Sequence, residues 1–162
     1  MTDLKELKQQ LVDYLSDHFS GQGVAVMGEF PPSPKPSPLL KSRIAVGFDA
    51  MAVQDAGLDD YLGEDSSQTL RGRYVQITLR FDLACPVRLG GGACQGLFEE
   101  LLDALLLRRN SLGVEELTCG PVAYDKNIGG FLLCAKGRMN ALISAGETSL
   151  AIDEIELRRV ME

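Results

Sequence analysis

One cysteine in this 162-residue sequence lies where reactive thiols are often found, directly after a run of glycines. The segment 89–96 reads Leu-Gly-Gly-Gly-Ala-Cys-Gln-Gly and leads into a predicted helix. Backbone N–H groups at the start of a helix can hold an anion, and the helix dipole there favours a cysteine thiolate. An enzymatic interpretation therefore rests on Cys94 as a nucleophile or redox thiol, with the amides after Gly92 binding a phosphate or an oxyanion. Because the spacing matches neither a P-loop nor a dinucleotide-binding fingerprint, we favour a flexible strand-to-helix loop.

The remaining residues offer little further chemistry. Cys85, Cys119 and Cys134 fall in apolar segments without the paired spacing of zinc ligands, which predicts buried free thiols in a reducing compartment. The single histidine, His18, is predicted on or beside the packed face of a helix, and we assign it no catalytic role. Two acidic pairs are interpreted as solvated surface: Glu115 with Glu116, and Asp153 with Glu154. The sequence thus predicts a non-enzyme with no catalytic residue, no metal ligand and no cofactor.

Charge and composition narrow the classes of protein further. The chain has 16 Lys and Arg against 23 Asp and Glu, and its net charge of −7 opposes binding to a phosphate backbone. Apolar runs such as 105–107 are far shorter than the roughly 20 residues that cross a bilayer. Charged residues within 1–19 interrupt any signal peptide. With 45% hydrophobic and 24% charged residues, we expect one compact domain over residues 1–162.

Periodicity predicts the elements that would position any site. Apolar residues at steps of three and four predict amphipathic helices over 4–18 and 97–106. Alternation predicts several strands. The predicted strands cover 44–51, 75–85, 114–124, which has a weaker pattern, and 131–143. Gly137 interrupts the strand over 131–143, and a turn at 126–130 precedes it. Residues 152–157 form a final edge strand or an arm. The order predicts an α+β fold, with a mostly antiparallel β-sheet and the two main amphipathic helices packed on one face.

Two long loops are expected outside these elements. Five prolines within 31–38 predict an extended connector over 31–41. Residues 44–70 contain no Lys or Arg but several carboxylates, which predicts an acidic loop over 54–73. Such a loop can bind a hard cation, yet the calcium-loop pattern is missing. A solvated loop or a partner-facing surface is the interpretation that we retain.

The arrangement resembles phage tail terminator or tail completion proteins. The resemblance rests on the opening helix, the strand Gly-Arg-Tyr-Val-Gln-Ile-Thr-Leu-Arg-Phe-Asp-Leu at 72–83, the helix Gly-Leu-Phe-Glu-Glu-Leu-Leu-Asp-Ala-Leu at 96–105, and the hairpin through Tyr124. It implies a homo-oligomeric ring, typically a hexamer, that caps the tail tube, ends its polymerisation and offers a surface to the head or neck connector protein. It further implies assembly in the host cytoplasm, a final place in the virion tail or neck, and DNA passing through the ring without sequence-specific contact.

Two alternatives to this function stay open at this stage. One is another component of a phage particle, such as a head–tail connector or a baseplate subunit. The other is the small cytosolic thiol or phosphate-binding enzyme that would use Cys94. For the assembly function we expect a partner interface formed by the acidic segment and nearby arginines: Asp55, Asp59, Asp60, Tyr61, Glu64, Asp65, Arg71, Arg73, Arg158 and Arg159.

Overall fold

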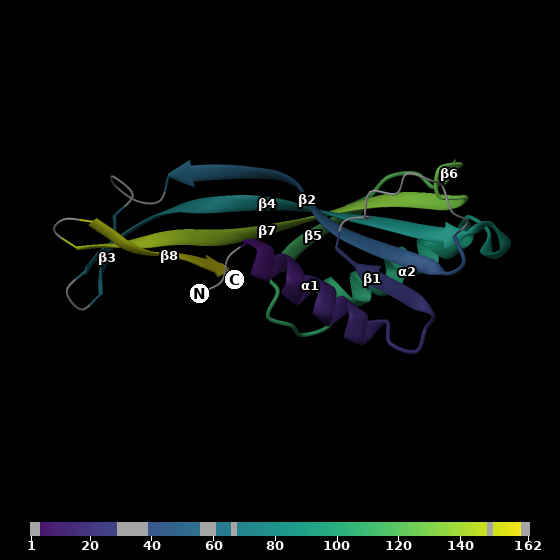
Figure 1. The fold of residues 1–162 in the computed structure, drawn as a ribbon, viewed down its shortest axis with the longest axis horizontal. Coiled ribbons are helices and arrows are strands. Elements are labelled where there is room, and N and C mark those ends of the chain that lie inside the picture. The colour runs from purple at the N-terminus through teal and green to yellow at the C-terminus, as the bar shows by residue number, and fades with distance from the viewer. Residues whose placement is uncertain (1–3, 29–38, 56–60, 66–67, 149–150, 160–162) are drawn as a thin grey trace.

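The chain folds into an α+β structure in which one mostly antiparallel sheet carries two helices on one face (Figure 1). This computed structural model describes residues 4–28, 39–55, 61–65, 68–148 and 151–159. For residues 61–62, 64–65, 68–71, 143–148 and 151–159 it describes the backbone alone. The predicted fold class is confirmed.

The two helices bury the apolar faces that their periodicity predicts. Helix α1 (Leu4–His18) buries three leucines at four-residue steps, and Gly21 follows its end with a φ of +81°. Helix α2 (Gly92–Leu102) continues into a π-helical turn, η3 (Asp103–Leu107). The hydroxyl of Tyr14 in α1 donates to the carbonyl oxygen of Ala104 in η3 at 2.6 Å. This bond ties the two helical segments together on the same face of the sheet.

In the part of the chain that the structure describes, the sheet has eight strands. Its central path is β1 (Val24–Met27), β2 (Ser42–Asp55), β4 (Gln68–Pro86), β7 (Gly130–Thr148) and β5 (Val114–Cys119). Strand β3 (Tyr61–Asp65) pairs with β4, whereas β6 (Ala123–Asp125) and β8 (Ala151–Arg159) pair with β7. Only β1 and β2 run parallel among the described pairs.

The core lies between the sheet and the helices. Alternate residues of β4 face the helices and are buried: Val75, Ile77, Leu79, Phe81 and Leu83. They belong to one cluster with the buried leucines of α1 and α2. Because successive strand residues point to opposite faces, the other face of β4 carries the polar residues that alternate with them. One sheet therefore presents an apolar face to the helices and a polar face to solvent.

The segment 54–73, predicted as an acidic loop, differs from that expectation. Its described residues lie in strands, because β2 ends at Asp55, β3 spans 61–65 and β4 begins at Gln68. The register pairs Asp55 with Arg73 and Tyr61 with Arg71. Backbone hydrogen bonds, which do not depend on apolar side chains, hold these strands. Hence no apolar alternation marked them in the sequence.

The position of Gly137 also differs from the prediction. It was predicted to interrupt a strand, but it lies within β7, directly opposite Leu79. A Cβ at this position would lie 3.2 Å from Cε2 of the Phe81 ring. Glycine here makes room for a buried aromatic ring instead of ending the strand.

Other predicted elements differ from the structure in their bounds or are resolved by it. The second helix begins at Gly92, five residues earlier than predicted at 97. The weak strand over 114–124 is divided into β5 and β6, because Pro121 lies between them and has no N–H for the ladder. The final segment is a strand, β8, paired with β7. Of the predicted connector over 31–41, residues 31–38 lie outside the described residues.

Candidate functional site

Part of the sheet extends beyond the two helices, and we call this part the arm (Figure 1). The arm consists of β3, β8 and the adjoining segments 51–55, 68–74 and 142–148 of β2, β4 and β7. In α1, Nζ of Lys8 lies 5.9 Å from the centroid of the Phe48 ring, three residues before Met51. The arm therefore begins where α1 no longer covers β2.

Two apolar side chains of β2 continue the core face into the arm. Met51 is 41% exposed and Val53 is 56% exposed. They are paired with the buried residues Ile77 and Val75 of β4, and directly opposed residues of antiparallel strands share a face. We name Met51 and Val53 the arm patch. Apolar surface that leaves a core face and remains uncovered is typical of a surface that binds a partner.

The outer edge of β2 is open beside the arm patch. Strand β1 pairs with β2 only as far as Ala45, while β4 occupies the opposite side of β2 as far as Asp55. Among the described residues, no strand pairs with the β1 side of β2 over residues 46–55. An open edge presents backbone N–H and C=O groups to which a strand of another chain can add.

A second exposed apolar group lies at the C-terminal end of β4. Val87 and Leu89 follow that strand in the 3-10 turn η2 (Val87–Leu89) and are 52% and 47% exposed. Nη2 of Arg88 donates to the carbonyl oxygen of Leu40 at 3.3 Å, which holds the 80%-exposed Leu40 beside the turn. We name Leu40, Val87 and Leu89 the end patch. One apolar surface thus lies beside the middle of β4, and a separate one follows the C-terminal end of the same strand.

Most residues of the predicted partner interface are on the arm. Asp55 and Arg73 form an exposed ion pair, with Oδ1 and Nη1 3.2 Å apart, a type of contact that adds little stability. The backbone register places the others along the arm strands: Tyr61, Glu64 and Asp65 in β3, Arg71 in β4, and Arg158 and Arg159 in β8. Asp59 and Asp60 lie outside the described residues. Neither the arm patch nor the end patch was predicted from the sequence.

Cys94 lacks the environment of a reactive thiol. Its side chain is fully buried, and this burial, together with a hydrogen bond to Cys85, raises the pKa of Cys94 to about 12. A thiol with that pKa stays protonated near neutral pH and is a poor nucleophile. The amides that follow the glycines are also engaged, because Ala93 N–H donates to the Gly90 carbonyl and Cys94 N–H to the Gly91 carbonyl. The structure argues against the hypothesis of an enzyme centred on Cys94.

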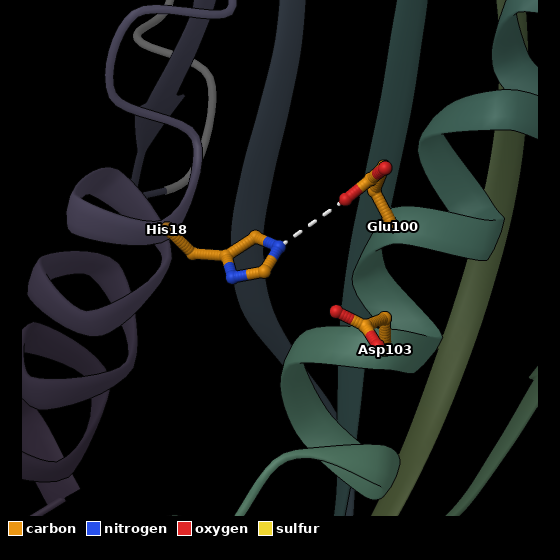
Figure 2. Close-up of side chains that lie close together, drawn as sticks. All are labelled: His18, Glu100 and Asp103. Carbon is orange, nitrogen blue, oxygen red and sulfur yellow. Dashed lines mark hydrogen bonds and ion pairs between the residues drawn. The ribbon is translucent and has the colours of Figure 1, made fainter.

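Three ionisable side chains meet where α1 ends against α2 (Figure 2). Nε2 of His18 lies 3.3 Å from Oε2 of Glu100. With Asp103, three residues further along the chain, they form a group whose donor atoms all lie within 4.8 Å of one another. The side chain of His18 is 11% exposed, against 49% for Glu100 and 36% for Asp103. We name these residues the helix-junction cluster, which the sequence did not predict.

Contacts on both sides hold the helix-junction cluster in place. The His18 ring packs edge-on against Phe19, a buried residue, at a centroid distance of 5.2 Å. On the other side, Nε of Arg108 donates to Oδ2 of Asp103 at 2.6 Å. The cluster therefore joins two helices whose relative position the core already fixes.

Glu115, Glu116 and the turn before β7 have structural partners, whereas the side chains of Asp153 and Glu154 lie outside the described part of the chain. Nη2 of Arg138 lies 3.2 Å from Oε2 of Glu116, and the amide of Asn140 donates to Glu115 at 3.1 Å. The carboxylate of Asp125 accepts the Asn127 N–H at 2.8 Å in the turn before β7. These contacts agree with the predicted surface and turn roles.

No helix within the described residues is long and apolar enough to cross a membrane. Comparison with protein-family models and with curated proteins gives no match to this chain. The features of the described residues that bear on function are the arm patch, the open edge of β2, the end patch and the helix-junction cluster.

Proposed function

We propose that this protein is a non-catalytic subunit of a ring that caps the tail tube of a phage or prophage particle. The observation that carries the proposal is the presence of two separate apolar surfaces, the arm patch beside the middle of β4 and the end patch at its C-terminal end. In a head-to-tail ring, each contact joins one surface of a subunit to a different surface of the next. The arm patch of one subunit packs against the end patch of its neighbour.

Two further features support this assembly. The open edge of β2 gives the arm a second means of contact, since a strand of the neighbour can extend the sheet. The net charge of −7 suits a ring through which DNA slides without sticking to basic side chains. The order of the elements is the basis of the resemblance to tail terminator proteins. That resemblance adds six subunits, the tube end and the head or neck connector as partners, assembly in the host cytoplasm, and a place in the tail or neck of the virion.

Native mass spectrometry of the full chain, alone and with the tail tube protein, tests the proposal. We expect a discrete ring of six copies, and with tubes added we expect rings at tube ends in negative-stain electron micrographs. Tubes capped in this way should stop elongating when free tube protein is supplied. A chain that stays monomeric across the concentration range and leaves tube growth unchanged would overturn the proposal.

A further inference from the structure

We infer that the helix-junction cluster, His18, Glu100 and Asp103, is a binding site for a divalent transition-metal ion, with Zn²⁺ as the favoured ion. This inference does not depend on the proposed ring, because the cluster lies on the helices and contains no residue of the arm patch or the end patch.

The distances within the cluster fit such an ion. Two ligands of a tetrahedral zinc site with bonds of 2.0–2.2 Å lie about 3.4 Å apart. His18 Nε2 and Glu100 Oε2 are already 3.3 Å apart. The donor atom of Asp103 lies within 4.8 Å of the other two, and the Asp103 side chain is 36% exposed. Figure 2 shows the His18 ring directed toward the continuous helix formed by α2 and η3, with Glu100 of α2 and Asp103 of η3 on the side that faces His18.

The placement on two helices supports the same conclusion. Glu100 and Asp103 are three residues apart, so their side chains share one helix face. Helical proteins build metal sites in this way, with a pair of ligands at that spacing on one helix and further ligands on a facing helix. His18 supplies the facing ligand from the last residue of α1.

The donor set favours zinc over magnesium or calcium. One imidazole nitrogen and two carboxylate oxygens suit first-row transition ions, whereas Mg²⁺ and Ca²⁺ prefer six or more oxygen ligands. Three protein ligands leave a fourth position for water. Arg108 bonds Oδ2 of Asp103 from outside the cluster, as hydrogen-bond partners of metal ligands commonly do. A carboxylate has enough lone pairs to hold Arg108 and a metal together.

Isothermal titration of the tag-free full chain with ZnCl₂ tests the site. The titrations use a Cys119→Ser background, because the exposed Cys119 thiol is itself a zinc ligand. We expect one Zn²⁺ per chain, a binding curve that excess Mg²⁺ leaves unchanged, and a melting temperature that rises with zinc. The separate variants His18→Ala, Glu100→Gln and Asp103→Asn should each weaken binding on the order of tenfold or more.

Glu99→Gln is the matched control, because it removes the same charge from the adjacent exposed residue of α2. It should leave zinc affinity unchanged. Absorption spectra with Co²⁺ give a second readout, since nitrogen and oxygen ligands produce visible bands without the thiolate charge-transfer band. Circular dichroism of the metal-free variants confirms that they fold. The inference is overturned by the absence of saturable binding, by equal losses in Glu99→Gln and Glu100→Gln, or by a thiolate spectrum; none of these results bears on ring formation.

Discussion

Replacing Val53 with lysine places a charge inside the proposed contact between subunits while leaving the core intact. Val53 is 56% exposed, so we expect the unfolding free energy of the isolated chain to change by about 0.5 kcal/mol at most. Full burial of a valine is worth about 1.5 kcal/mol, so covering the exposed 56% contributes about 0.8 kcal/mol. The lysine ammonium must also lose water when the contact forms, so each contact between subunits loses about 2 kcal/mol or more of binding free energy. That loss raises the dissociation constant of the contact about 30-fold.

Size-exclusion chromatography with light scattering over a dilution series measures this loss. Val53→Lys should move the transition from ring to monomer to at least about 30-fold higher concentration. Val87→Lys, at the 52%-exposed end patch, should have a similar effect. Leu107→Lys is the control, because Leu107 is 70% exposed but belongs to neither patch. Rings of Val53→Lys that survive dilution as well as wild-type rings would refute the reasoning, and so would equal losses in Leu107→Lys.

Three further predictions concern the fold and its thiols. Gly130→Ala places a Cβ 2.5 Å from the carbonyl oxygen of Cys85, so denaturant titration should show a loss of about 2 kcal/mol. Gly96→Ala in α2, where the added carbon meets no atom within 4 Å, should instead stabilise by about 0.5–1 kcal/mol; a loss there would contradict the packing argument. Iodoacetamide near neutral pH should modify the exposed Cys119 and spare Cys94, as read by peptide mass spectrometry; rapid labelling of Cys94 would contradict its burial. Because the pKa of Cys94 rises from 9.0 to about 12 on folding, the unfolded chain loses this proton first. The free energy of unfolding should therefore fall between about pH 9 and about pH 12, and it should fall up to about 1.4 kcal/mol per pH unit more steeply in the wild type than in Cys94→Ala. Equal slopes of unfolding free energy against pH in the two proteins would exclude this contribution of Cys94.

The helices and the central strands could be predicted because each has one buried face. Leu7, Leu11 and Leu15 reveal α1 through their spacing, and the alternation from Val75 to Cys85 reveals the middle of β4. Such patterns reflect burial, so they end where burial ends. The strands of the arm continue past that point on backbone hydrogen bonds, which all residues except proline can make.

The arm patch escaped prediction for a local reason. The register between β2 and β4 shifts between Phe48 and Ala50. This shift reverses which residues face the helices, so Met51 and Val53 join the core face although they break the alternation of Ile44 and Phe48. A strict period of two assigns them to the wrong face.

The helix-junction cluster was beyond prediction for a different reason. His18 and Glu100 are 82 positions apart in the sequence, and they meet only because the core packs the end of α1 against α2. The periodicity of each helix placed His18 near a packed face correctly. It carried no information on which residues of the other helix lie opposite.

The long pairing between β4 and β7 makes the sheet stiff along its length. Its pairing continues without a shift from Thr69 opposite Glu147 to Pro86 opposite Gly130. The 19 residues of β4, at about 3.3 Å each, span about 60 Å. A force on the tip of the arm is shared by the many backbone hydrogen bonds between β4 and β7, and the helices pack against the same two strands. Bending or twisting of the arm should therefore also move the part of the sheet that carries the helices.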